Sequence, residues 1–343
     1  MAQTADPKAQ ADAPARPTQD AIEVLAALLR EDLVGVDAII HSGVGSPVGM
    51  IPRLASYLID AGGKRIRPMI TLAAARLHGG GGDAARKLAA AVEFIHSATL
   101  LHDDVVDESA LRRGKASANH VWGNQAAVLV GDFLFARSFN LMVEAGDIGV
   151  LDVLARASSI IAEGEVMQLA AANDADTTIE RYLEIIEAKT AALFAAAARV
   201  GAMAAGKAGV IADALYEYGR NIGLAFQLVD DALDYGGLAA RMGKNVGDDF
   251  REGKVTLPVA LAREAGDGEE REFWRRVMGV GERTDADFEL ALTILRRRNA
   301  IQRTLETART YATRAQAALA DMPDNAYRAV LMDLPDFVVD RAY

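Results

Sequence analysis

Cysteine is absent from the 343 residues of this chain. Its absence excludes a disulfide framework, thiolate metal sites and a cysteine nucleophile, and it is compatible with a reducing cytoplasm, where we expect the protein to lie. Positive charge is also scarce, because 37 Lys and Arg are outnumbered by 48 Asp and Glu, which leaves a net charge of −11. We therefore expect no nucleic-acid partner, and any phosphate-binding site must concentrate its cations locally.

Long uncharged apolar runs are missing as well. No stretch of 18 residues is apolar throughout and free of charge, so we expect no membrane-spanning helix and at most peripheral contact with a membrane. Residues 1–18 are Ala, Pro and polar residues without the apolar centre of a signal peptide. We predict a disordered N-terminal tail there.

Proline is missing from the middle of the chain: all nine prolines lie at or before Pro68 or at or after Pro258. The region between them is rich in Ala, Leu, Ile, Met and Glu at spacings of three and four residues, which is typical of amphipathic helices. No segment shows the sustained two-residue alternation of a half-buried strand. The sequence therefore predicts an all-α fold. The breaks between helices are short and alike in composition, so residues 19–343 are predicted to form one domain.

A first acidic cluster lies in the segment LLHDDVVDESALRRGK at residues 100–115. On a helix Asp103 and Asp107 are four positions apart and share a face, with Asp104 about 100° round the axis. Such close carboxylates repel each other unless a cation lies between them. The apolar flanks indicate a buried helix rather than a solvated acidic face, and oxygen ligands without Cys or His favour Mg²⁺ completed by substrate phosphates.

A second cluster repeats this design in FQLVDDALDYGG at residues 226–237, with Asp230, Asp231 and Asp234. Asp230 and Asp234 are again four apart on an apolar helix. Two such clusters facing each other across a cavity could hold a diphosphate through bridging Mg²⁺ ions.

Basic residues accompany both clusters. GGKRIRP at residues 62–68 supplies Lys64 and Arg67 at an expected helix start, where glycines and the helix dipole favour phosphate, although a solvated basic patch is the alternative. Arginine suits bidentate contact with phosphate oxygens. The other candidate donors are Arg112, Arg113, Lys189 with Thr190, Lys244, Lys254 and the neutral Gln168 and Gln227.

These motifs, in this order, resemble the trans-isoprenyl diphosphate synthase family. They stand here as GGKRIRP, DDVVD followed by LRRGK, GEVMQL, KT, FQLVDDALDY and GKNVGDDFREGKVTLP, and the likeness runs from about residue 20 to the C-terminus. The stretch EFIHSATLLHDDVVDESALRRGKASAN is most similar to the long-chain octaprenyl and decaprenyl diphosphate synthases of quinone side-chain synthesis. The resemblance implies a single bundle of long helices around a central cavity, and a homodimer.

The resemblance also implies roles for the motif residues. Mg²⁺ and the allylic diphosphate are expected on both aspartate clusters: Asp103, Asp104, Asp107, Asp230, Asp231 and Asp234. Isopentenyl diphosphate is expected on Lys64, Arg67, His96 and Arg113. The allylic or departing diphosphate is expected on Arg112, Gln168, Lys189, Gln227, Lys244 and Lys254, with Thr190 and Gln227 steadying a carbocation. His96 lies seven residues before Asp103 and so on nearly the same face, whereas His102 is expected to be structural.

Product length should depend on an apolar tunnel below the first cluster. Ala98 and Thr99 lie roughly 6–8 Å down the helix from Asp103 at 1.5 Å per residue, where short-chain members of the family resembled carry aromatic residues. Their small side chains favour a product near C40–C50, although Ala98 could be a packing alanine. Phe135, Phe139 and Met142 form either a deeper floor or ordinary core.

Several other functions remain as alternatives. A short- or medium-chain synthase making C15–C20 would share every charged motif. A terpene cyclase or head-to-head synthase needs no isopentenyl site, so Lys64, Arg67 and His96 argue against it. A phosphohydrolase, suggested by the adjacent His102 and Asp103, wants several histidine ligands, and the chain has five histidines without a second cluster around them. A catalytically silent partner subunit would not need intact aspartate clusters.

Overall fold

The computed structural model describes residues 20–112, 114–236 and 247–341. The predicted all-α fold is confirmed, with one short hairpin as the exception within these ranges. Strands β1 (Leu111–Arg112) and β2 (Lys115–Ala116) pair antiparallel just after the first acidic cluster.

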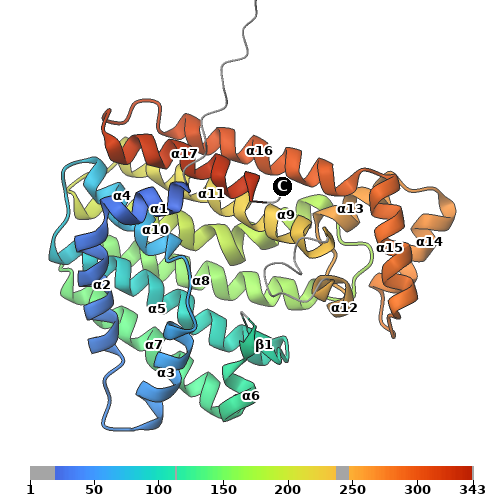
Figure 1. Cartoon of the computed structure of the whole chain (residues 1–343), viewed down its shortest axis with the longest axis horizontal. Coiled ribbons are helices and arrows are strands. Elements are labelled where there is room, and N and C mark those ends of the chain that lie inside the picture. The colour runs from blue at the N-terminus through green and yellow to red at the C-terminus, as the bar shows by residue number, and fades with distance from the viewer. Residues whose placement is uncertain (1–19, 113, 237–246, 342–343) are drawn as a thin grey trace, which may run out of the picture.

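The helices of the N-terminal half and those of the C-terminal half pack into one bundle (Figure 1). The first group is α1 (Ala21–Leu28), α2 (Arg30–Gly43), α3 (Met50–Asp60), α4 (Ile66–Leu77), α5 (Asp83–Val106), α6 (Ala118–Trp122), α7 (Asn124–Glu144) and α8 (Ile148–Ala171). The second is α9 (Ile179–Ile186), the π-helical turn η1 (Glu187–Ala191), α10 (Ala192–Ala204), α11 (Val210–Tyr235), α12 (Asp248–Glu252), α13 (Leu257–Glu264), α14 (Gly268–Met278), α15 (Asp285–Arg297), α16 (Ala300–Ala318) and α17 (Ala326–Asp340).

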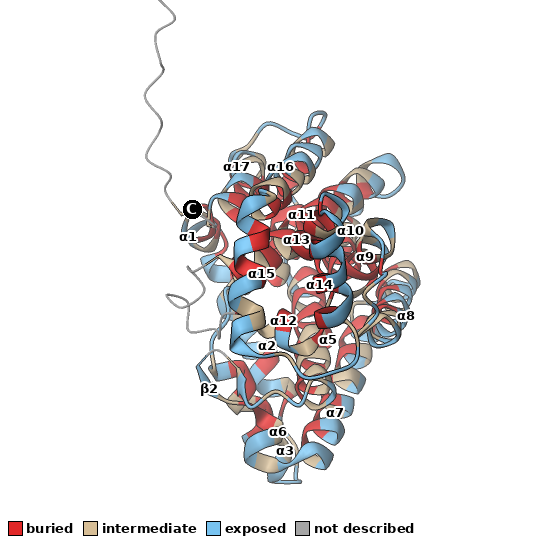
Figure 2. Ribbon diagram, turned by 90° about the vertical axis from the view of Figure 1, so that its right-hand side faces the viewer, coloured by how far each residue is buried: buried red, intermediate tan, exposed pale blue. Residues whose placement is uncertain are grey.

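Helix α10 lies at the centre of the bundle and contacts α4, α5, α8 and α11. Nearly all of its residues are apolar and buried, as expected for a helix that is surrounded by other helices. Figure 2 shows buried residues gathered along the inner sides of the helices and exposed residues along the outer sides. A second cluster of buried apolar side chains includes the fully buried Trp274. It contains residues of α13, α14, α15 and α16, in the C-terminal part of the chain.

Helix α7 is the one helix of the described ranges that is long and apolar enough to cross a membrane by length and composition. It packs along α5 and also contacts α3, α6 and α8. Leu134, Leu141 and Met142 of α7 are buried in the main core. Only part of its apolar surface is buried in this way, because Leu129 and Val143 of the same helix are exposed.

Glycines let the central helices approach closely. A Cβ added at Gly219 of α11 would lie 2.2 Å from the carbonyl oxygen of Phe194 in α10, and one added at Gly201 of α10 would lie 2.2 Å from that of Thr71 in α4. Because both obstacles are backbone atoms, no side-chain rotation can relieve the clash.

We expect Gly219→Ala to destabilise the protein by about 1–3 kcal/mol, since α10 and α11 would have to separate. Gly268→Ala is the matched control: Gly268 is the exposed first residue of α14 and has no atom within 4 Å of an added Cβ, so alanine should be neutral or stabilising by about 0.4–1 kcal/mol. Urea unfolding midpoints of the two variants and the wild type make the comparison. Equal midpoints for both variants would contradict the close contact.

Candidate active site

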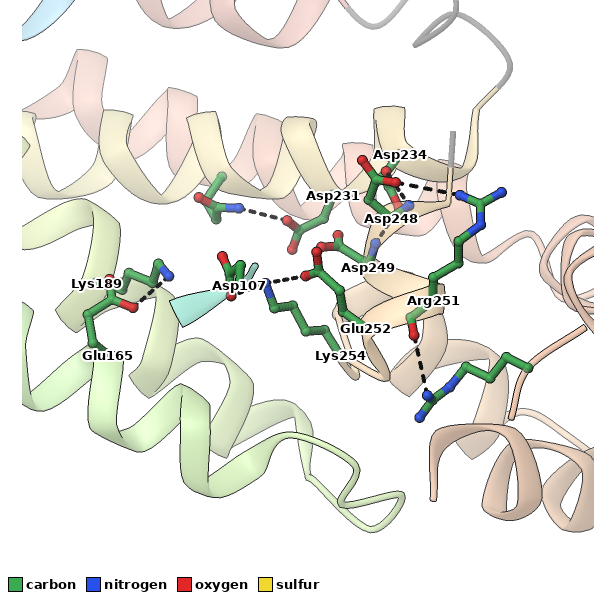
Figure 3. Close-up of polar contacts among 12 residues, drawn as sticks. Asp107, Glu165, Lys189, Asp231, Asp234, Asp248, Asp249, Arg251, Glu252 and Lys254 are labelled. Atoms are coloured by element: carbon green, nitrogen blue, oxygen red, sulfur yellow. Dashed lines mark hydrogen bonds and ion pairs between the residues drawn. The ribbon is translucent and has the colours of Figure 1, made fainter. Parts of the chain in front are cut away.

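The two acidic clusters end the two long helices α5 and α11, beside a cavity of about 150 Å³. Side chains from α8, α9, η1, α11, α12 and the segment leading into α13 line it. The structure brings six of the predicted site residues together in its wall: Gln168, Lys189, Thr190, Gln227, Asp231 and Lys254. Figure 3 shows Asp231 pointing from α11 toward Asp107 and Lys254. Residues far apart in the sequence therefore form one polar site.

The first cluster is only partly accessible. The Asp104 side chain is fully buried, and its Oδ1 accepts hydrogen bonds from Nε and Nη2 of Arg112 at 2.8 and 2.7 Å. Burial raises the pKa of Asp104 and also that of Asp103, against the opposing influence of Arg112 and Lys189. Asp107 accepts from Nζ of Lys254 at 3.3 Å. Arg112, predicted to contact diphosphate, thus contacts a carboxylate of the first cluster.

Each aspartate of the second cluster has a different partner. Asp230 accepts from Arg341 near the C-terminus at 2.8 Å. Asp231 accepts a short hydrogen bond from the Tyr182 hydroxyl and another from Gln227 Nε2 at 2.8 Å. Burial raises the pKa of Asp231 to about 7, although both hydrogen bonds oppose the increase.

Asp234, the last member of this cluster, faces the start of α12. Its carboxylate accepts backbone N–H groups from Asp248 and Asp249. Burial raises the pKa of Asp234 to about 6, while these backbone hydrogen bonds lower it.

The cations of the site rest on nearby carboxylates. Lys189, in the η1 turn, lies 2.7 Å from Glu165 of α8, and Lys254 lies 2.5 Å from Glu252. Burial alone would lower the pKa of Lys254, but the carboxylates of Asp107 and Glu252 have the larger combined effect and raise the pKa above its usual value. This lysine is therefore protonated. The cavity therefore contains ammonium groups that are already paired with protein carboxylates.

The η1 turn is placed by two glycines. A Cβ added at Gly164 of α8 would lie 2.7 Å from the backbone nitrogen of Lys189. A Cβ added at Gly223 of α11 would lie 2.7 Å from Cα of Ala191. Within the turn, the Thr190 hydroxyl donates to Gln227 Oε1 at 2.9 Å. A π-helical turn is a frequent feature of functional sites, and here it directs Lys189 and Thr190 into the cavity wall.

The residues predicted for isopentenyl diphosphate gather near α17. Arg67 Nη1 lies 3.1 Å from His96 Nε2, and its guanidinium stacks on Phe194 at 4.2 Å from the ring centroid. Burial lowers the pKa of Arg67 to about 10, against the influence of Glu93 and Asp230. Lys64 lies 5.2 Å from the ring centroid of Phe337 in α17. The predicted Arg113 and Lys244 lie outside the described residues.

The predicted chain-length residues belong to α5 and α7, which pack along each other. Ala98 is 1% exposed, and the Thr99 hydroxyl donates to the His96 carbonyl at 2.8 Å. The Phe135 and Phe139 rings meet edge to face at 5.3 Å. These four residues are not among those that line the described cavity, so their effect on product length stays a prediction. His102 contacts the Val128 carbonyl and Asp132 of α7, in keeping with its expected structural role.

Four further residues of the site were not predicted. Glu165 lies in the motif GEVMQL and Asp249 in the motif GKNVGDDFREGK. Their acidic side chains within these motifs could have marked them as site residues. Burial raises the pKa of Asp249 well above its usual range. The sequence around Tyr182 and Arg341 does not mark them as site residues. Each reaches the site through an aspartate of a different helix, Asp231 for Tyr182 and Asp230 for Arg341.

The donor set fits a hard divalent cation. The described residues contain no group of three Asp, Glu, His or Cys side chains already close enough to enclose an ion. Mg²⁺ usually takes one or two carboxylates and completes its shell with water and phosphate, so an open arrangement is suitable. Oδ2 of Asp104 is buried without a hydrogen-bond partner within the described part of the chain, and such an oxygen is stabilised by a cation.

Comparison with known proteins agrees with this geometry. Residues 49–295 match the polyprenyl synthetase family. The octaprenyl diphosphate synthase of Escherichia coli (strain K12) is 44% identical over 320 residues, which cover 93% of this chain and 99% of that protein. The all-trans-nonaprenyl-diphosphate synthase (geranyl-diphosphate specific) of Rhodobacter capsulatus is 41% identical over 312 residues, 91% of this chain and 95% of that protein.

A crystal structure of a polyprenyl synthase from Caulobacter crescentus CB15, complexed with calcium and isoprenyl diphosphate, is also similar. It is 54% identical with a TM-score of 0.91 and covers 94% of this chain and 98% of that one. The protein therefore belongs to the polyprenyl synthetase family. Its chemistry is that of a prenyltransferase, which excludes the phosphohydrolase alternative.

The Tyr182–Asp231 hydrogen bond should be visible in the pH dependence of the enzyme. This bond lowers the pKa of Asp231 from the value that burial alone would set, so Tyr182→Phe should raise that pKa above about 7. A metal ligand must be deprotonated, and the acidic limb of activity at subsaturating Mg²⁺ should therefore move upward by about one pH unit.

Tyr216→Phe is the control, because it removes a hydroxyl from the part of α11 away from the cavity. Activity is measured from pH 5 to 9 for both variants, about the range in which the limb should fall. An acidic limb that stays in place in Tyr182→Phe would show that Asp231 does not titrate in this range.

Proposed function

We propose that this prenyltransferase repeatedly adds isopentenyl diphosphate to an allylic diphosphate and makes a polyprenyl diphosphate of about C40–C50 for quinone side chains. The convergence of the two aspartate clusters, Lys189, Lys254 and Gln227 around one cavity carries the proposal. The likeness over nearly the whole chain to octaprenyl and nonaprenyl diphosphate synthases supports the long product.

Mg²⁺ would be held by Asp103, Asp104 and Asp107 from α5 and by Asp230 and Asp231 from α11. When bound, it would neutralise charge on the leaving diphosphate. The lysines and Arg112 would complete this neutralisation. Each of them now pairs with a carboxylate of the protein, and diphosphate oxygens can replace that carboxylate when a cation occupies it. Their positive charge is thus in place before the C–O bond breaks.

The second substrate would bind through Lys64, Arg67, His96 and Arg113. Its double bond would attack the allylic carbon, and the proton lost from the new cation would pass to the released diphosphate. Thr190 and Gln227, joined by their hydrogen bond, would present oxygen atoms toward the carbocation. Apolar wall residues such as Ile185, Ile186 and Val255 would exclude water that could quench it.

A homodimer is part of this proposal. Large apolar side chains are exposed on α7 and α8, among them Val128, Leu129, Ile160 and Val166. Exposed apolar groups on neighbouring helices favour burial against a second copy. The absence of cysteine is compatible with a cytoplasmic location. The hydrophobic product would be released through peripheral contact with a membrane.

The direct test incubates the protein with Mg²⁺, farnesyl diphosphate and labelled isopentenyl diphosphate and sizes the dephosphorylated products by chromatography. We expect a ladder that ends near C40–C50. A ladder that ends at C15–C20 would refute the long product but keep elongation. No incorporation at all would refute the proposed function.

Enlarging the side chain at position 98 should shorten the product, because Ala98 lies below the first cluster where the growing chain must pass. The series Ala98→Val, Ala98→Leu and Ala98→Phe should give progressively shorter end products. Its smallest member keeps the test usable, since overpacking by a full ring can cost about 3 kcal/mol. An unchanged product from a folded Ala98→Leu enzyme would rule out a tunnel at this position.

A further inference from the structure

The segment from Gly247 to Lys254 brings two polar side chains to the cavity. Asp249 and Lys254 both line its wall, and Lys254 reaches across to Asp107 of the first cluster. The segment contains only the five-residue helix α12, which is too short to be stable by itself. Its position must therefore be fixed by contacts with the rest of the protein.

Asp234 supplies the contacts at the beginning of the segment. Its backbone carbonyl accepts the N–H of Gly247 at 3.0 Å. Its Oδ1 accepts the N–H of Asp248 at 3.3 Å, and its Oδ2 accepts the N–H of Asp249 at 3.2 Å. The first N–H groups of a helix have no partner within the helix, and a carboxylate there is electrostatically favourable. Both oxygens of Asp234 are thus used to hold the start of α12 (Figure 3).

Arg283 holds the other end. Its guanidinium donates to the Arg251 carbonyl at 3.3 Å and to Oδ1 of Asn173 at 2.6 Å. Asn173 N–H in turn donates to the Gly253 carbonyl at 3.2 Å. Gly253 has φ +71°, and an added Cβ would lie 2.1 Å from Nη2 of Arg283, so the backbone and the guanidinium are in tight contact.

We propose that Asp234 is a positioning residue, which aligns α12 so that Lys254 meets Asp107, and that it does not ligate the metal. The inference rests on the proposed function, because it assigns Lys254 to the diphosphate. Its hydrogen bonds distinguish Asp234 from Asp231: both oxygens of Asp234 accept backbone N–H groups, whereas the Asp231 carboxylate accepts from the side chains of Tyr182 and Gln227. The second cluster is thereby connected to the first through α12.

Metal binding provides the first test, and it does not depend on catalysis. Mn²⁺ binding is measured by electron paramagnetic resonance in the presence of inorganic diphosphate, for the wild type, Asp234→Ala and Asp230→Ala. Asp230→Ala removes a carboxylate on the same helix, one turn earlier, and should weaken Mn²⁺ binding by about tenfold or more. Asp234→Ala should leave it within about twofold of the wild type, a free-energy difference below 0.5 kcal/mol. Equal weakening in both variants would overturn the proposal.

Amide hydrogen exchange provides the second test, on metal-free protein. Asp234→Ala should speed exchange over residues 247–254, because local opening becomes easier when the hydrogen bonds are lost. Asp248→Ala is the control: it removes a half-exposed carboxylate, which lies 3.5 Å from Arg251, but keeps the backbone N–H that donates to Asp234, so exchange should change much less than in Asp234→Ala. Unchanged exchange in Asp234→Ala would contradict the positioning role.

Kinetics then separates positioning from general damage. Asp234→Ala should lower kcat by about 10–100-fold, as loss of an orienting partner typically does, with an unchanged melting temperature. Asp234→Asn keeps one accepting oxygen and should recover part of the rate, with Mn²⁺ binding unchanged in both variants, whereas loss of a metal ligand would weaken Mn²⁺ binding together with the rate. No recovery with Asp234→Asn would count against the proposal. If the wild type itself fails to incorporate isopentenyl diphosphate, the proposed function fails, while the exchange result still decides the role of Asp234 in the fold.

Discussion

The burial of closely spaced carboxylates is the constraint on which this structure depends. Burial raises the pKa of Asp103, Asp104, Asp231 and Asp249, which means that each anion is costly where it lies. The protein offsets this cost with guanidinium and ammonium groups, a tyrosine hydroxyl and backbone N–H groups. Nearly every polar contact around the cavity can be understood as a partial neutralisation of these anions.

The same pairing prepares the site for a charged substrate. Lys189 rests on Glu165, Lys254 on Asp107, and Arg112 on Asp104. In the proposed function, a metal diphosphate would bring both signs of charge and would replace both members of each pair, so no cation or carboxylate would be left unpaired in a buried place.

The sequence predicts those features that depend on local periodicity. The all-α fold follows from apolar spacing, and the placement of each aspartate cluster on one helix follows from intervals of one and four residues. Contacts between helices could not be obtained in this way. The contact of Arg112 with Asp104 joins the β1 strand to α5, and the partners of Asp230 and Asp231, Arg341 and Tyr182, depend on how α9, α11 and α17 pack. Closeness of this kind is a property of tertiary packing, which a single sequence does not display.

The η1 turn has a consequence for how this part of the chain can change in length. A π-helical turn holds one residue more than an α-helical turn, so the loss of one residue from Glu187–Ala191 would leave a regular α-helical turn and keep the orientation of α10. Gly201 would then still face α4. The residue lost, however, would come from the turn that carries Lys189 and Thr190, which line the cavity. The same change in length would thus spare the packing of the bundle and alter the cavity.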